Sequence, residues 1–139
     1  MTKEDNEERK CWGHKIEDRM MAFFKGSRNQ YDEVDFETST SLYEVKSCRL
    51  INKCSSGNFA QGKTKERSET THFGRFCINT NNHILLYLRS LQLNKKPKYI
   101  FVLRVGNQTI FKIRDWAEVS ILNNKDIHHI PLSKVFNDE

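Results

Sequence analysis

The sequence predicts a mixed α/β fold in which helices pack against a mixed β-sheet. Three observations predict it. Residues 5–24 carry apolar side chains at intervals of three to four, the period of a helix with one buried face. Residues 42–48 alternate between apolar and polar side chains, as a half-buried strand does. Residues 99–105 form a near-continuous apolar run, which is typical of a central strand.

The composition is that of one soluble-type domain with a modest positive charge. The chain has 139 residues, of which 37% are hydrophobic and 11% aromatic, enough to bury a core and to exclude disorder throughout. Its 23 Lys and Arg against 18 Asp and Glu give a net charge of +5, which favours a polyanionic partner without identifying one. We expect a single domain over residues 1–139, with residues 1–10 as a charged leader.

The sequence also predicts an intracellular protein with no membrane partner. No apolar stretch approaches the roughly 20 residues of a membrane-spanning helix, and the mixed-charge N-terminus lacks the apolar region of a secretory signal. We therefore expect a cytoplasmic location. The four cysteines form no C-x-x-C pair, so we interpret them as reduced thiols, with a metal or disulfide role as the alternative. They are Cys11, Cys48, Cys54 and Cys77.

The N-terminal half predicts a helix followed by a hairpin. The helix over residues 5–24 ends at the breaker Gly26-Ser-Arg-Asn29. Residues 30–36 are expected to form a strand, residues 38–41 a turn, and residues 42–48 the second strand of the hairpin. The buried stripe of the helix is expected to contain Trp12, Ile16, Met20, Phe23 and Phe24.

The middle of the chain predicts a loop, a strand and a second helix. Residues 52–71 have few apolar anchors and several Gly, Ser and Lys residues, so we expect a mobile basic loop there. A third strand is expected over residues 73–78, and Asn81 or Asn82 is expected to cap the helix that follows. The stripe of that helix is predicted to be Ile84, Leu85, Leu88, Leu91 and Leu93.

The C-terminal part predicts two strands, a short helix and an edge strand. A turn at Gly106-Asn107 is expected to connect the central strand of residues 99–105 to a strand over residues 109–113. Asp115 is expected to cap a short helix that ends at Leu122. An edge strand is expected around Ile130-Pro131.

Three charged residues of the hairpin form the most informative constellation. Asp35 lies at the end of the first strand, and Glu44 and Lys46 share one face of the second. The hairpin brings Asp35 beside Glu44, and two such carboxylates repel one another unless a divalent cation lies between them. Oxygen ligands favour Mg²⁺ or Mn²⁺, and such an ion promotes phosphodiester hydrolysis by offsetting developing charge and activating water. Lys46 would orient that water or offset charge on the phosphate.

This constellation resembles the motif of the PD-(D/E)xK nuclease superfamily. Val34-Asp35 and Glu44-Val45-Lys46 carry the resemblance, although Val34 stands where the motif usually has proline. Glu17 on the first helix matches a further acid that many members use at the metal, and Ser47 follows Lys46 as in many members. The resemblance covers roughly residues 10–115 and implies a restriction-endonuclease-like α/β/α sandwich around a mixed β-sheet.

The resemblance implies a divalent-metal-dependent endonuclease that hydrolyses DNA phosphodiester bonds. Asp35, Glu44 and Glu17 would hold Mg²⁺ or Mn²⁺, and Lys46 would assist the nucleophile. The archaeal Holliday-junction-resolvase-like branch implies structure-selective cleavage, and restriction endonucleases imply duplex cleavage. Two alternatives stay open: a non-catalytic nucleic-acid-binding module with the same fold, and an unrelated α/β protein in which these are surface residues.

Basic residues around the site are candidates for contacts with phosphates. The candidate nucleic-acid-binding residues are Arg49, Lys53, Lys63, Lys65, Arg67 and Arg75. A solvated charged loop is the alternative. His72 and His83 are candidates for proton transfer, or else for capping, packing or phosphate contacts, and His128-His129 is assigned no role.

A homodimer is expected on the same resemblance, because small members of the superfamily that cut two strands are usually dimers. Its candidate interface is the predicted final helix, and the alternative is that these residues belong to the chain's own core. They are Trp116, Val119, Ile121 and Leu122.

Overall fold

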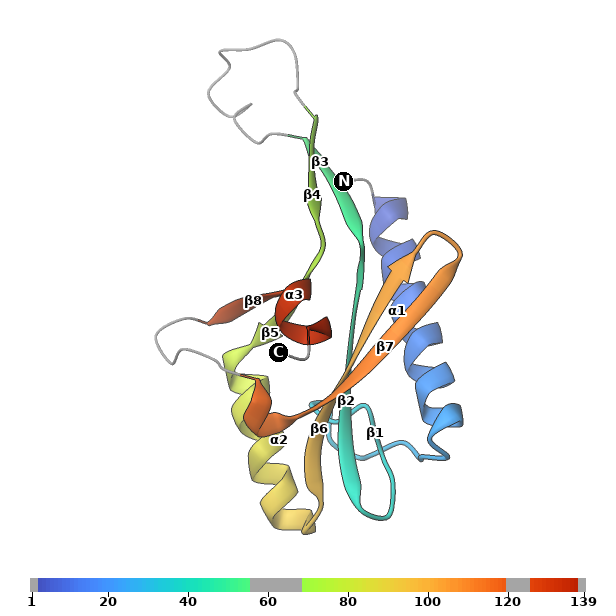
Figure 1. The fold of residues 1–139 in the computed structure, drawn as a ribbon. Helices are drawn as coiled ribbons and strands as arrows, with labels where there is room; N and C mark the ends of the chain where they lie inside the picture. The colour runs from blue at the N-terminus through green and yellow to red at the C-terminus, as the bar shows by residue number, and fades with distance from the viewer. Residues whose placement is uncertain (1–2, 56–68, 120–125, 138–139) are drawn as a thin grey trace.

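The computed structural model describes residues 3–55, 69–119 and 126–137, and these form a mixed α/β fold (Figure 1). The helical elements are α1 (Lys3–Phe23), α2 (Thr80–Leu93), the 3₁₀ turn η2 (Trp116–Glu118) and α3 (Leu132–Phe136). The strands are β1 (Phe36–Glu37), β2 (Ser41–Arg49), β3 (Ile51–Ser55), β4 (Glu69–Phe73), β5 (Arg75–Asn79), β6 (Lys96–Val105), β7 (Gln108–Asp115) and β8 (Ile127–Pro131).

The main sheet is mixed and has the strand order β1-β2-β6-β7. β2 and β6 are parallel, whereas β1 pairs with β2 and β7 pairs with β6 in the antiparallel sense. Two further antiparallel pairs, β3-β4 and β5-β8, lie outside this sheet. β3 continues from the end of β2, and with β4 it forms an arm that leads away from the sheet (Figure 1).

Helices lie on both faces of the main sheet, and β6 shows this most clearly. Ile100 and Val102 of β6 pack in one core cluster with Ile16 of α1. The alternating residues Tyr99 and Phe101 pack in a second cluster, on the face covered by α2, β5 and β8. All four side chains are buried, so the central strand predicted over residues 99–105 is confirmed.

Several other elements agree with the sequence prediction. The first helix is confirmed, and because it begins at Lys3 it includes most of the charged leader. β2 and β7 extend the predicted strands by one or two residues at each end. The turn between β6 and β7 has Gly106 at a φ of 61°, in the left-handed region that glycine adopts without steric cost.

The strand predicted over residues 30–36 is wrong except at its end, where β1 consists of Phe36 and Glu37. The preceding residues form turns instead, because the Asn29 side chain accepts a hydrogen bond from the Tyr31 amide at 2.8 Å. The Val34 amide then donates to the Tyr31 carbonyl at 3.1 Å. The hairpin itself is present, since Phe36 pairs with Tyr43.

The loop predicted over residues 52–71 is wrong at both ends. Ile51–Ser55 and Glu69–Phe73 are strands β3 and β4, paired from Ile51 with Phe73 to Ser55 with Glu69. These strands pair mainly with each other, so their sequences show no alternation that would identify a strand against a core. Residues 56–68 lie outside the described part of the chain. The third strand, predicted to begin at residue 73, begins instead at Arg75 as β5.

The second helix is present, but its cap and buried face differ from the prediction. Asn79 is the N-cap, and its side chain accepts a hydrogen bond from the Asn82 amide at 3.2 Å. The side chains that it buries are His83, Leu86 and Ser90. Three of the predicted stripe residues are exposed: Ile84, Leu88 and Leu91. Both faces carry apolar residues, so periodicity alone does not identify the inner one.

The short helix predicted to end at Leu122 is shorter than predicted. η2 ends at Glu118, whose side chain accepts a hydrogen bond from the Asp115 amide at 3.1 Å, and residues 120–125 lie outside the described ranges. The predicted edge strand is present as β8, which pairs with β5. Residues 132–136 then form α3.

The orientation of α2 can be tested by truncating one leucine from each face. Leu86 is fully buried, so we expect Leu86→Ala to lower the free energy of unfolding by about 2–5 kcal/mol, the range for deleting a buried leucine side chain. Leu88 is 47% exposed, so Leu88→Ala should change it by about 0.5 kcal/mol or less. Urea denaturation measures both, and a larger loss for Leu88→Ala would contradict the helix orientation.

Candidate functional site

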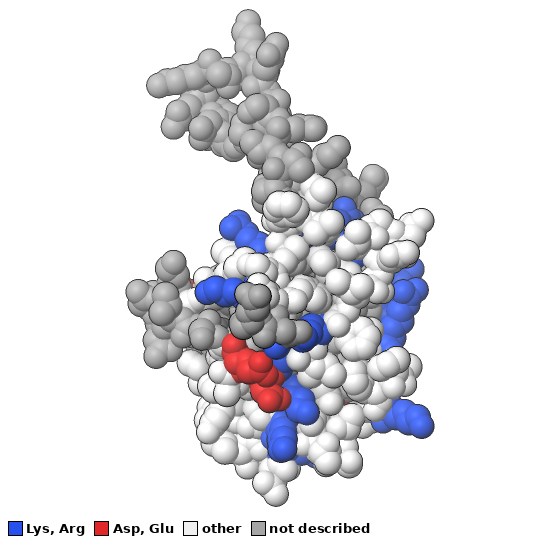
Figure 2. Space-filling view, in the orientation of Figure 1, with Lys and Arg blue, Asp and Glu red and all other residues white. Residues whose placement is uncertain are grey.

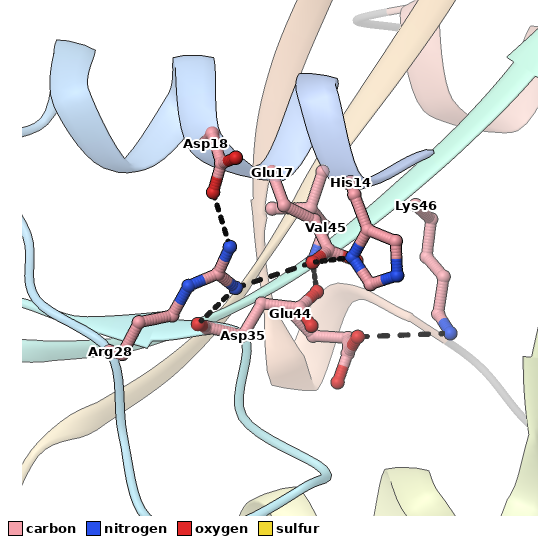
Figure 3. Close-up of polar contacts among 8 residues, drawn as sticks. All are labelled: His14, Glu17, Asp18, Arg28, Asp35, Glu44, Val45 and Lys46. Atoms are coloured by element: carbon pink, nitrogen blue, oxygen red, sulfur yellow. Dashed lines mark hydrogen bonds and ion pairs between the residues drawn. The ribbon is translucent and has the colours of Figure 1, made fainter. Parts of the chain in front are cut away.

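Asp35 is fixed against the edge of β2 by two hydrogen bonds. Its amide donates to the Tyr43 carbonyl at 2.9 Å, and its Oδ2 accepts from the Val45 amide at 2.7 Å (Figure 3). The second bond occupies a backbone donor that β1, only two residues long, does not reach. The Asp35 carboxylate is therefore held beside the residue before Val45, which is Glu44.

Glu44 and Lys46 lie on the same face of β2, as the alternation predicts. Their neighbours Tyr43 and Val45 are buried in the core cluster on the α1 side. The Lys46 Nζ lies 3.9 Å from the Glu44 Oε1, at the outer limit of an ion pair, and both side chains are largely shielded from solvent. The sheet therefore places the Glu44 carboxyl and the Lys46 ammonium next to each other on β2.

The Glu44 carboxyl has a pKa well above its ordinary value. Burial is the largest cause, and the hydrogen bond to the Asp35 carboxylate and the negative charge of Asp35 add to it. The negative charge of Glu17 acts in the same direction, whereas the Lys46 ammonium lowers the pKa. Glu44 is thus exposed to the negative charges of Asp35 and Glu17, which Lys46 compensates in part.

Glu17 extends this acidic cluster from α1. Burial and the charge of Asp35 raise the pKa of its carboxyl, while Arg28 and His14 lower it. The Arg28 Nη1 lies 3.3 Å from the Glu17 Oε2, and the His14 Nδ1 lies 3.7 Å from the same oxygen (Figure 3). The structure therefore brings together all four predicted site residues, with Glu17 directed toward Arg28.

Arg28 is the residue of this cluster that sequence reasoning missed. It donates to the Glu17 carboxylate and to the Asp35 carbonyl, both at 3.3 Å, and its other terminal nitrogen is bonded to Asp18. It thereby ties the end of α1 to the segment before β1. Its position in the Gly26–Asn29 breaker gives no periodic signal, so only the folded chain identifies its partners.

The donor set fits a hard divalent cation at Asp35 and Glu44. The Asp35 carboxylate is held beside Glu44 by the Val45 amide, and oxygen ligands of this kind are those that a hard divalent cation prefers. In the part of the chain that the structure describes, no three His, Cys, Asp or Glu side chains are already arranged as a metal site. The ligand roles of Asp35, Glu44 and Glu17 stay predictions, and the Glu17 carboxylate is paired with Arg28.

The predicted phosphate-contacting residues are dispersed over β2, the arm and β5. Arg49 ends β2 and is exposed, Lys53 lies in β3, and Arg75 is exposed at the start of β5. Lys63, Lys65 and Arg67 lie outside the described residues. Figure 2 shows lysine and arginine side chains spread over this face of the molecule, whereas acidic side chains gather in one small patch.

His83 is a buried packing residue. Its Nδ1 lies 2.6 Å from the Tyr99 hydroxyl, and its ring stacks on Trp116 with 4.3 Å between ring centroids. Burial, aided by His128, lowers the pKa of His83 to about 4, so the ring is neutral at physiological pH. His72 lies in β4. The packing alternative therefore applies to His83.

The residues predicted for a dimer interface are in part core residues. The Trp116 indole donates to the His83 carbonyl at 2.7 Å, and Val119 is buried in the cluster on the α2 side. Ile121 and Leu122 lie outside the described ranges. The alternative that Trp116 and Val119 belong to the chain's own core is the one that these contacts favour.

Cys48 and Cys77 are free thiols, and burial, with a contribution from Cys77, raises the pKa of Cys48 to about 11. The side chains of Cys11 and Cys54 lie outside those described. No helix in the described ranges is long and apolar enough to cross a membrane.

Comparisons of the chain with protein-family models, with curated proteins and with solved structures found no match.

The raised pKa of Glu44 predicts that the Glu44→Gln variant becomes more stable than the native chain at high pH. A carboxyl with a folded pKa above its unfolded value stabilises the fold below the unfolded pKa, and this contribution is lost as the pH rises through the folded pKa. Glutamine mimics the protonated form at every pH. In EDTA at pH 8 we expect Glu44→Gln to be more stable than the native chain by about 0.5–2 kcal/mol.

Thermal and urea denaturation at pH 5 and pH 8 measure this difference. Asp32→Asn removes one negative charge from an exposed side chain and serves as the matched control, with little change at either pH. A Glu44→Gln protein that is less stable than the native chain at pH 8 would contradict the electrostatic interpretation.

Proposed function

We propose that the chain is a divalent-metal-dependent endonuclease that hydrolyses DNA phosphodiester bonds. The observation that carries the proposal is the hydrogen bond that holds the Asp35 carboxylate at the Val45 amide, the residue between Glu44 and Lys46, whose side chains lie 3.9 Å apart on the same face of β2. The mixed sheet with helices on both faces agrees with the restriction-endonuclease-like sandwich that the PD-(D/E)xK resemblance implies.

Asp35 and Glu44 would hold Mg²⁺ or Mn²⁺. When bound, the ion supplies a Lewis acid for the scissile phosphate and lowers the pKa of an attacking water. The bond from the Val45 amide holds the Asp35 carboxylate in position without further rearrangement. Arg28 neutralises Glu17, which limits the repulsion between this third carboxylate and the other two.

Lys46 would act on the nucleophile and the phosphate. Its ammonium is close enough to Glu44 to interact with it, and it projects from the same face of β2. A compact cation there can orient a water molecule or offset charge that develops on the phosphate oxygens. The same pairing lets Lys46 reduce the repulsion between the carboxylates and an approaching phosphate.

Cleavage of labelled DNA with Mg²⁺ or Mn²⁺ tests the proposal. We expect Glu44→Ala and Lys46→Ala to lower the cleavage rate at least 100-fold, a typical contribution of one positioned acid, base or metal-binding group. Lys95→Ala is the matched control, because Lys95 forms an ion pair with Glu37 outside the site, and it should retain the native rate.

The substrate set separates the alternatives. Nicking confined to four-way junctions would favour a structure-selective enzyme, and cutting of linear duplex would favour a restriction-type activity. If single-stranded, duplex and junction DNA all stay intact while the native chain and both variants bind them equally, the nuclease proposal fails and a non-catalytic nucleic-acid-binding module replaces it.

Metal binding provides a second test that does not require cleavage. A cation that binds only the folded chain should stabilise it by about 2.7 kcal/mol at one hundred times its dissociation constant. We expect Mn²⁺ to raise the melting temperature of the native chain and of the exposed-site control Asp32→Asn, but not of Glu44→Gln. Equal stabilisation of all three proteins would place the ion elsewhere.

A further inference from the structure

Two arginines lie side by side where β2 and β6 end. Arg49 and Arg104 are register partners on these parallel strands, and neighbouring strands lie only about 4.8 Å apart. Both follow the alternation of residues that face α1, since Val45 and Val102 are buried on that side. Like charges in directly neighbouring positions destabilise a sheet unless an anion or solvent compensates them.

Neither guanidinium is paired with a carboxylate among the side chains that the structure describes. Arg104 donates from Nε to the Gly106 carbonyl at 3.3 Å, and its guanidinium lies 5.5 Å from the centroid of the Trp12 ring. Arg49 is exposed, and none of the described side chains forms a contact of this kind with it. The terminal nitrogens of both forks are therefore available to a ligand.

The two arginines line a pocket of about 440 Å³, which we call the arginine pocket. Its lining consists of Arg49, Leu50, Ile51, Arg104, Val105 and Gly106. Ile51 and Val105 are 49% and 40% exposed, so the walls beside the cations are apolar. A volume of this size lies in the range of small-ligand sites.

The backbone around the arginine pocket is fixed where three segments meet. The Leu50 amide donates to the Arg104 carbonyl at 2.9 Å, and the Gly74 amide donates to the Leu50 carbonyl at 2.7 Å. Gly74 approaches the Arg49 carbonyl so closely that a side chain at this position would clash with it. The two arginines thus project from a frame that binding does not need to order.

We propose that the arginine pocket binds a backbone phosphate of the DNA substrate, with the apolar walls against the neighbouring sugar or base. The guanidinium fork matches phosphate oxygens in bidentate geometry, and two forks surround one such group. The proposal rests on the proposed function, which supplies DNA as the substrate. Arg49 follows Lys46 by three residues, roughly 10 Å along β2 and on its other face, so the arginine pocket is separate from the candidate metal site.

Binding of fluorescently labelled duplex and junction DNA in EDTA tests this site without cleavage. We expect Arg49→Gln and Arg104→Gln each to weaken binding about tenfold. The slope of log affinity against log salt concentration should fall by about 0.9 for each lost phosphate contact. Lys96→Gln is the matched control, since Lys96 is exposed at the opposite end of β6 and carries the same charge. It should change affinity less than twofold.

The outcomes separate this proposal from the proposed function. If the native chain cuts DNA while both arginine variants bind like Lys96→Gln, the arginine pocket is not a phosphate site and the nuclease proposal stands. If binding depends on both arginines but no DNA is cut with either metal, the pocket stands and the nuclease proposal fails. Melting temperatures close to that of the native chain establish that the variants are folded. If the native chain itself does not bind DNA, the proposal of a phosphate site in the arginine pocket is overturned.

Discussion

The bond from the Val45 amide to the Asp35 carboxylate determines the geometry of the candidate site. β1 is too short to pair with this part of β2, and a side chain takes the place of a neighbouring strand. A carboxylate that satisfies a backbone donor cannot move away from Glu44 without leaving that donor unpaired. The hairpin therefore holds the Asp35 carboxylate near Glu44, and the charge of Asp35 adds to the burial that raises the pKa of Glu44.

Local patterns predicted the elements whose burial follows from their own sequence. The apolar run of β6 is buried on both faces, and β2 alternates because one face meets α1. The buried face of α2 could not be identified in this way, because the exposed Ile84, Leu88 and Leu91 are as apolar as the buried Leu86. Its inner face contains the polar His83, which becomes a suitable core residue only through the Tyr99 hydroxyl on a distant strand. The strands of the arm escaped prediction because they pair with each other rather than with a core.

The candidate site was predictable to the extent that it depends on strand alternation. The period of two places Glu44 and Lys46 on one face whichever residues precede them, and any tight hairpin brings Asp35 near. The strand predicted over residues 30–36 was mostly wrong, yet Asp35 has the expected neighbour because only the two residues after it need to pair. Arg28 and the pairing of Arg49 with Arg104 depend on contacts between distant segments, which one sequence does not contain.

β2 carries charges of opposite sign in separate places, and this separation bears on how a polyanion would approach. Carboxylates that hold a metal also repel phosphates, so affinity for DNA has to come from cations outside the acidic cluster. Lys46 lies at the boundary of that cluster, where it interacts with Glu44. Arg49 and Arg104 lie beyond it, where no described carboxylate reduces their charge. In the proposed function the acids would hold the cation and the arginines would supply the attraction for phosphates, so the two tasks would fall to separate groups of side chains.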